Sequence, residues 1–456
     1  MTKREKRDVW LSLAAVVASA ATVVTCSALG PARPPVPPPT ATSSAPEPIA
    51  CVSAPAPPSP APSEAKPEPV PSLAPLPAHP AAGTSAEGNP LPQLPRFFQS
   101  LGALRSKSRD HHVRVLWLGD SHTQADVWTA ALRNALQGKF GKGGPGFVHI
   151  GWASKHYRHG GVTIRVEGKW RRVPSGLVSV RKVDDGIFGL GGVRLVPDSQ
   201  GAKSSIAVDA NHVPGKVRFD VAFRLPDAGD ALSITATGGP AVQATQKDAD
   251  AGLPNAVRHV LLESPGPGGT IEVMPTSGSP ELMGVIIESS EPGVVVDTLG
   301  LNGARYATAL AYDEASWVRE VARRAPDLVI MAYGSNESSD GKIRPDRHAA
   351  LVEQLIARVR AAAPSAECLV FGPIDRGGKS YEEAVEELNG AQRAAASKAG
   401  CAFWSGQTAM GGKGSMTKWE AEEPPLAQPD LLHLTSKGYE RLGNMLARDI
   451  LAAGGL

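Results

Sequence analysis

Five short apolar segments, separated by stretches of helical character, constrain the fold of this chain most strongly. They cover residues 113–118, 294–299, 328–333, 368–371 and 401–404. Apolar residues recur at helical spacing in the intervening and following stretches, notably over residues 123–137, 349–363, 381–398 and 435–450. Strands that alternate with helices favour a parallel sheet with helices packed on both faces. The sequence therefore predicts an α/β fold built on a doubly wound parallel sheet.

A long segment between the first two apolar runs breaks this rhythm. Residues 152–291 contain short alternating stretches, such as 162–166, 216–223 and 231–237, with Gly, Pro and Asp between them. Short strands at this spacing are typical of a β-sandwich or a similar all-β module. We therefore predict an inserted all-β domain over 152–291, which divides the α/β domain into residues 96–151 and 292–456.

The N-terminus has the character of a targeting segment. A basic cluster within residues 3–7 precedes residues 9–29, which carry no charge and are long enough to span a bilayer as a helix. The positive flank predicts that the N-terminus stays in the cytoplasm and that the rest of the chain is exported to the periplasmic side of the inner membrane. A cleaved signal peptide and a lipoprotein site at Cys26 are the alternatives, although Thr25 is a poor residue before a lipidated cysteine. We assign residues 1–30 to an anchor or signal segment.

A linker follows the targeting segment. Pro, Ala and Ser dominate residues 31–95. Such a sequence buries too little apolar surface to offset its ordering entropy, so it is predicted to be an extended, disordered spacer. A tether of this kind would hold a folded domain away from a membrane or wall.

Composition excludes some classes of function. Lys and Arg number 47 against 45 Asp and Glu, and aromatic residues make up 5% of the chain, so neither a basic patch nor a stacking platform for nucleic acid is indicated. The four cysteines, Cys26, Cys51, Cys368 and Cys401, form no CxxC pair and no zinc-like cluster, so no metal site is predicted. Cys368 and Cys401 either pair as a disulfide in an oxidising compartment or stay as two buried thiols.

Two polar clusters have the residue types needed for nucleophilic catalysis. Ser121 follows the first predicted strand, and function gathers at the carboxyl ends of strands in an open parallel sheet. Taken alone, Ser121 is equally well explained as a helix cap. Asp430 and His433 lie three residues apart before the last predicted helix, so the carboxylate can hold the imidazole in the tautomer that deprotonates a serine.

Two further turns offer groups that stabilise an oxyanion. Asn336 follows the predicted strand 328–333, and its side-chain NH₂ can donate to a developing negative charge. Gly303 follows the predicted strand 294–299, where a glycine lets the backbone approach a ligand closely and offers a second N–H donor. Each of these turns, taken singly, is ordinary.

Together and in chain order, these blocks resemble the SGNH/GDSL hydrolase family. The matching text is Gly119-Asp120-Ser121, then Gly303, then Gly334-x-Asn336, then Asp430-x-x-His433. The resemblance implies a flavodoxin-like SGNH hydrolase fold and a serine esterase without metal or organic cofactor. It also implies that Ser121 is the nucleophile, His433 the general base and Asp430 the residue that orients it. The oxyanion hole would comprise the Ser121 and Gly303 N–H groups and the Asn336 side chain.

Longer stretches of the same blocks are similar to the bacterial peptidoglycan O-acetylesterases. These stretches are GDSHTQAD, YGSNE and DLLHLTSKGY, and that subgroup also carries a β-rich, carbohydrate-binding-like insert. Two residues depart from the commonest family text: His122, where Leu is frequent, and Glu337, where Asp often follows the Asn. The resemblance implies an envelope esterase that removes O-acetyl groups from a wall glycan through an acyl-enzyme. An O-acetyltransferase, a general lipase or esterase, and a non-catalytic glycan-binding protein are the alternatives.

Overall fold

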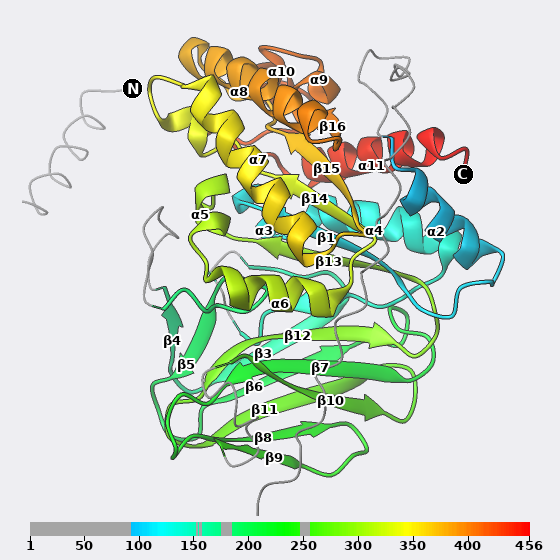
Figure 1. The fold of residues 1–456 in the computed structure, drawn as a ribbon, viewed down its shortest axis with the longest axis vertical. Helices are drawn as coiled ribbons and strands as arrows, with labels where there is room; N and C mark the ends of the chain where they lie inside the picture. The colour runs from blue at the N-terminus through cyan, green and yellow to red at the C-terminus, as the bar shows by residue number, and fades with distance from the viewer. Residues whose placement is uncertain (1–92, 152–153, 155–156, 175–184, 247–255) are drawn as a thin grey trace, which may run out of the picture. The chain divides into compact units, whose positions relative to one another are not determined.

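The computed structural model describes residues 93–456 except 152–153, 155–156, 175–184 and 247–255 (Figure 1). The predicted anchor or signal segment at residues 1–30 and nearly all of the predicted linker at 31–95 lie outside the described residues. Within the described ranges, no helix is both long enough and apolar enough to cross a membrane.

Each of the five apolar runs forms a strand of one parallel sheet. In the described residues these strands are β1 (Val113–Gly119), β13 (Val294–Gly300), β14 (Leu328–Ala332), β15 (Glu367–Gly372) and β16 (Ala402–Ser405). Their spatial order is β13-β1-β14-β15-β16. The second strand in the chain thus lies outside the first and the remaining strands follow on the other side, which is the flavodoxin-like order. The predicted α/β fold class is confirmed.

Helices cover both faces of this sheet because successive side chains of each strand point to opposite sides. In β1, Val113, Val115 and Trp117 join one hydrophobic core, and Leu116 and Leu118 join the other. Burying one such side chain stabilises the fold by about 1.5–3 kcal/mol. The first core is covered by α2 (Pro95–Arg105), α4 (Val127–Phe140), α9 (Gly406–Met410), α10 (Ser415–Glu420) and α11 (Ser436–Ala453). The second is covered by α5 (Tyr306–Leu310), α6 (Glu314–Arg324), α7 (Pro345–Ala362) and α8 (Lys379–Lys398).

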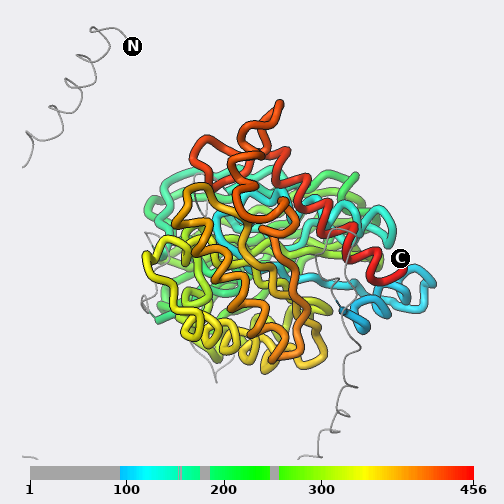
Figure 2. Tube along the Cα trace, turned by 90° about the horizontal axis from the view of Figure 1, so that it is seen from above, coloured from blue at the N-terminus to red at the C-terminus, as the bar shows by residue number. Residues whose placement is uncertain are grey.

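The C-terminal helix packs beside the first helices of the described chain. α11 lies against α4, and α4 in turn contacts α2. Figure 2 shows the C-terminal end next to the first described helix. Gly443 makes this approach possible, because a Cβ there would lie 2.4 Å from the backbone oxygen of Trp128. The first and last helices of the described chain, α2 and α11, therefore cover the same face of the parallel sheet.

The segment between β1 and β13 forms two antiparallel sheets (Figure 1). Within the described residues, one sheet contains β2 (Gly146–Val148), β4 (Trp170–Val173), β5 (Arg194–Pro197), β7 (Val217–Arg224), β10 (Arg258–Ser264) and β12 (Glu281–Ser289). The other contains β3 (Val162–Glu167), β6 (Lys203–Val208), β8 (Ala231–Ala236), β9 (Val242–Thr245) and β11 (Gly269–Ser277). Side chains from both sheets share one hydrophobic core. The predicted all-β insert is confirmed, and its antiparallel pairing begins at β2, ahead of the predicted border at residue 152.

One predicted helix is divided. The spacing predicts a helix over residues 123–137, but α3 (Ser121–Gln124) and α4 are separate, and Asp126 between them has a left-handed φ of 53°. The buried Asp126 carboxylate accepts hydrogen bonds from Thr129, Arg133, Gly160 and Thr298. Burial opposes its ionisation, but Arg133 and His159 hold the pKa of Asp126 well below its usual range. These contacts offset the strain of the left-handed backbone at Asp126, and they connect α4, the insert and β13.

The structure settles the state of two cysteines that the sequence left open. Cys368 and Cys401 form a disulfide. Cys368 lies in β15 and Cys401 directly precedes β16. The bond therefore joins neighbouring segments at the edge of the parallel sheet.

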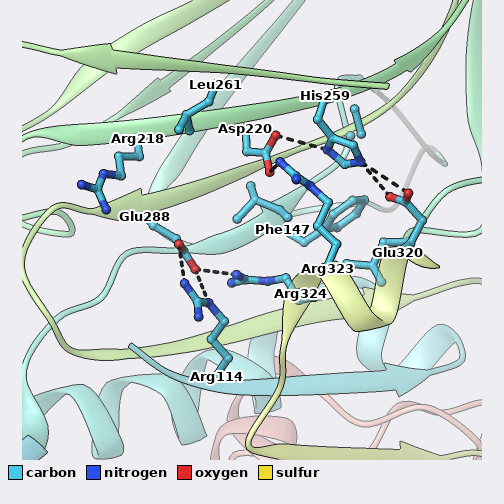
Figure 3. A pocket seen from close by; sticks show the side chains of 14 residues that line it. Arg114, Phe147, Arg218, Asp220, His259, Leu261, Glu288, Glu320, Arg323 and Arg324 are labelled. Carbon is cyan, nitrogen blue, oxygen red and sulfur yellow. Dashed lines mark hydrogen bonds and ion pairs between the residues drawn. The ribbon is translucent and has the colours of Figure 1, made fainter. Parts of the chain in front are cut away.

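A histidine links the insert to the α/β domain inside a cavity of about 260 Å³ (Figure 3). His259 on β10 lies between Asp220 on β7 and Glu320 on α6, at 3.2 Å from the nearer oxygen of each carboxylate. Burial opposes the imidazolium, but hydrogen bonds to both carboxylates outweigh it and raise the pKa of His259 to about 9. Arg323 on α6 also reaches Asp220, at 2.7 Å. This ion-pair network connects the two parts of the fold.

The His259 network predicts a pH-dependent contribution to stability. Because the pKa rises from 6.5 to about 9 on folding, the contribution is complete below 6.5 and is lost as the pH rises through 9. His259→Gln is expected to lower the free energy of unfolding by about 2–3 kcal/mol near pH 6 and by much less near pH 10. Urea unfolding at both pH values measures this, and His111→Gln at an exposed pair is the control. An equal loss at both pH values would contradict the ion-pair account.

Candidate active site

The predicted site residues gather where the strand order of the parallel sheet reverses, which is where open α/β sheets bind ligands. Ser121 is the first residue of α3, directly after β1. Asn336 follows β14, the neighbour of β1, and Gly303 follows β13 on the other side. Asp430 and His433 reach the same edge from the loop before α11. All five predicted residues therefore come from carboxyl ends of strands or from the loop above them.

A continuous chain of hydrogen bonds joins Ser121, His433 and Asp430. The distance from Ser121 Oγ to His433 Nε2 is 3.0 Å, and that from His433 Nδ1 to Asp430 Oδ2 is 2.8 Å. With Nδ1–H donating to the carboxylate, Nε2 is free to accept the serine proton. The three residues line a pocket of about 570 Å³. This is the arrangement of a nucleophile, a general base and an orienting carboxylate.

Hydrogen bonds within the loop fix the positions of Asp430 and His433. Leu431 has a left-handed φ of 51°, and Asp430 Oδ1 accepts hydrogen bonds from the N–H groups of Leu432 and His433. Partial burial acts against the charged carboxylate, but hydrogen bonds from His433 and this backbone lower the pKa of Asp430. These hydrogen bonds therefore favour the charged form of Asp430, which accepts the hydrogen bond from His433 Nδ1.

The three predicted oxyanion donors differ in how they are engaged. The backbone N–H groups of Ser121 and Gly303 donate to no acceptor among the residues that the structure describes. Gly303 has a φ of 78°, which glycine adopts without strain. Asn336 Nδ2 donates to Ala304 O at 3.0 Å and, weakly, to Asp120 Oδ2 at 3.4 Å. The second hydrogen of this amide is thus loosely held and can turn to a substrate oxygen.

Asn336→Ala is expected to lower kcat for an acetyl ester by about 10²–10³-fold with little change in KM, because an oxyanion donor acts mainly in the transition state. Steady-state kinetics with a small acetyl ester measures both constants. Asn211→Ala, in the insert and away from the site, is the control. A change confined to KM would contradict the assignment of Asn336 to the oxyanion hole.

His122 contacts the predicted site, although in the sequence it stood out only as a departure from the commonest family text and as part of the GDSHTQAD block. Its buried ring lies 5.1 Å from the ring of His433, centroid to centroid, and its Nδ1 is 2.7 Å from the Tyr439 hydroxyl. Burial, and then the charge on His433, lower the pKa of His122 to about 3. His122 is therefore a neutral ring beside His433, the predicted general base. No local pattern in the sequence predicted its contacts with His433 and Tyr439.

Two buried carboxyl groups lie behind Asn336. Burial raises the pKa of Asp120 to about 8 and that of Glu337 to about 7. Asp120 accepts a hydrogen bond from the His122 N–H, and Glu337 Oε1 accepts one from the Tyr306 N–H. At neutral pH, Asp120 is mostly uncharged. Burial of both groups therefore lowers the negative charge behind Asn336 relative to two ordinary carboxylates.

Comparison with known proteins identifies the domain. Residues 266–441 match the model of the GDSL-like lipase/acylhydrolase family. The chain carries a GDSL-like lipase/acylhydrolase domain. The matched residues begin within the all-β insert, just before β11, and end in α11, so Ser121 and β1 lie ahead of them. The enzyme class is accordingly that of the SGNH hydrolases.

The GDSL-like domain also resembles solved structures. One is the structure of a peptidoglycan O-acetylesterase in action, at 5 min. Its sequence is 25% identical to this chain and the TM-score is 0.65. The match covers 79% of this chain and 96% of that protein. A family two carbohydrate esterase from Cellvibrio japonicus shares 11% identity and has a TM-score of 0.27. That match covers 64% of this chain and 95% of the esterase. A GDSL-like lipase from Parabacteroides merdae shares 14% identity and has a TM-score of 0.29. That match covers 36% of this chain and 73% of the lipase. No curated protein matches this chain significantly.

Proposed function

We propose that this protein is a cell-envelope serine esterase that removes O-acetyl groups from peptidoglycan. The observation that carries the proposal is the hydrogen-bonded chain from Ser121 through His433 to Asp430 at the reversal point of the sheet. The likeness to a peptidoglycan O-acetylesterase, which covers the insert as well as the α/β domain, supports a glycan ester as the substrate.

The reaction follows from the order of the hydrogen bonds. His433 Nε2 takes the proton from Ser121 as its oxygen attacks the acetyl carbonyl. The N–H groups of Ser121 and Gly303 and the Asn336 amide hold the charge on the carbonyl oxygen. His433 then gives the proton to the departing sugar oxygen. In the second half of the reaction His433 takes a proton from water, the water oxygen attacks the acetyl carbonyl, and His433 returns the proton to the Ser121 oxygen as acetate leaves.

The proposed location is the periplasmic side of the inner membrane, reached through residues 1–30 and the linker 31–95. The basic cluster followed by an uncharged apolar stretch supports this, and so does the Cys368–Cys401 disulfide, since disulfides persist mainly in oxidising compartments. Lipidation at Cys26 or cleavage of the segment gives the same compartment by another route.

The test is acetate release from O-acetylated peptidoglycan, measured beside hydrolysis of a small acetyl ester. Release from the glycan is the expected result. Cleavage of the small ester alone would reject the wall glycan as substrate, and a preference for long acyl chains would favour a lipase. Transfer of acetyl groups to an added sugar acceptor, detected as acetylated product, would identify a transferase. Binding of the glycan without cleavage of either ester would reject an enzyme.

A further inference from the structure

A buried amide connects the helix that begins at the predicted nucleophile to the turn that carries Gly303. Gln124, the last residue of α3, is 3% exposed and lines the pocket that contains Ser121. Its Oε1 accepts a hydrogen bond from the Asn302 N–H at 2.9 Å. Asn302 directly precedes Gly303 in the chain. One side chain therefore spans the two backbone segments that supply the predicted N–H donors of the oxyanion hole.

The turn that Gln124 contacts has a defined shape. The Ala304 N–H donates to the Leu301 carbonyl oxygen, and Gly303 at the third position has a φ of 78°, as a type II turn requires. Two side chains hold this turn from opposite ends. Gln124 accepts the Asn302 N–H, and Asn336 Nδ2 donates to the Ala304 oxygen at 3.0 Å. The turn that carries the Gly303 N–H is thus tied both to α3 and to the predicted amide donor.

The surroundings of Gln124 fix the orientation of its amide. Gln124 Nε2 donates to Ser154 Oγ, so Oε1 faces the Asn302 N–H. The reverse orientation would place two N–H donors against each other. The backbones of α3 and β13 also approach closely, because a Cβ on Gly300 would lie 2.3 Å from the backbone nitrogen of Gln124. The Gln124 side chain extends this contact to the turn beyond the end of β13.

We propose that Gln124 is a positioning residue for the predicted oxyanion hole. By holding the Asn302 N–H, it keeps the adjacent Gly303 N–H in place relative to Ser121, where the carbonyl oxygen of the ester becomes charged. A donor that is already in position stabilises a developing charge without reorganisation, so a loosened turn weakens mainly the transition state. The inference rests on the proposed function and adds to it a residue that acts through the backbone of its neighbour.

The first test removes the acceptor. Gln124→Met keeps an unbranched side chain of similar length and is expected to lower kcat for a small acetyl ester about tenfold with little change in KM. Affinity for trifluoroacetone, whose tetrahedral adduct with Ser121 carries an oxyanion, should fall by a similar factor. Gln137→Met is the matched control, since Gln137 is also buried and its Nε2 donates to the Val294 oxygen at the start of β13. The control is expected to lower the free energy of unfolding and to leave kcat unchanged.

The second test removes the donor of the same hydrogen bond. Proline has no N–H and is common at the second position of a type II turn, so Asn302→Pro deletes the donor while the turn is retained. The reference is Asn302→Ala, which also lacks the Asn side chain but keeps the N–H. The proline variant is expected to have a kcat about tenfold below that of the alanine variant. Combining Asn302→Pro with Gln124→Met should add little, because both changes remove one bond.

Three results would overturn the inference while leaving a serine esterase: an unchanged kcat in Gln124→Met, an equal loss of kcat in Gln137→Met, or a change confined to KM. If Gln124→Met does not fold, equal kcat values in Asn302→Pro and Asn302→Ala would overturn it instead. A parent protein that is folded but cleaves no acetyl ester would reject the proposed function, and the role of Gln124 with it.

Discussion

Ser121→Ala is expected to lower kcat for a small acetyl ester by about 10⁴–10⁶-fold, because the variant has no oxygen to form the acyl-enzyme. A residual rate above that in water is expected to persist, since the predicted oxyanion donors come from the backbone and from Asn336 and remain in the variant. The side chain is half-buried, and among the described residues its hydrogen bond is to His433, so the free energy of unfolding should change by less than about 1 kcal/mol.

Steady-state hydrolysis and thermal unfolding of the two proteins measure these effects together. Ser108→Ala, at an exposed serine after α2, is the matched control and should retain full activity. A loss of less than tenfold in a folded Ser121→Ala protein would show that another residue attacks the ester.

Asp430→Asn is expected to lower kcat by about 10³-fold while the protein stays folded. An amide at this position can donate to His433 Nδ1. The neutral imidazole then carries its proton on Nε2, which faces Ser121, so it cannot accept the serine proton. The measured quantity is kcat between about pH 6 and pH 9, and the loss should persist across this range because Asp430 has a lowered pKa and stays charged in the parent. Asp346→Asn, an exposed carboxylate at the start of α7, is the control. Unchanged kcat in Asp430→Asn would remove Asp430 from the triad.

The sheet was predictable because its strands are short apolar runs bounded by turns. Buried parallel strands have this pattern, so residues 113–118 and 294–299 became β1 and β13 with borders nearly as expected. The break at Asp126 was not predictable. The left-handed backbone there depends on hydrogen bonds from Thr298 and Gly160, which lie far away in the sequence and approach only in the folded chain.

The candidate site was predictable to a similar extent. Ser121, Asn336 and Gly303 follow predicted strands, so the topology alone brings them to one edge of the sheet. The environment of these residues was hidden, because burial depends on packing between distant segments. His122 meets Tyr439 of the last helix, and the raised pKa of Asp120 arises from burial that no local pattern reveals.

The most direct test of the proposed mechanism is to trap its intermediate. The protein is mixed with an O-acetylated substrate, quenched with acid within the first turnovers, digested, and examined by mass spectrometry. The predicted result is a single acetyl group on the peptide that contains Ser121, which disappears as substrate runs out and never forms in Ser121→Ala. Steady release of acetate with no acetylated enzyme, or an acetyl group on another residue that turns over at the same rate, would contradict the acyl-enzyme on Ser121.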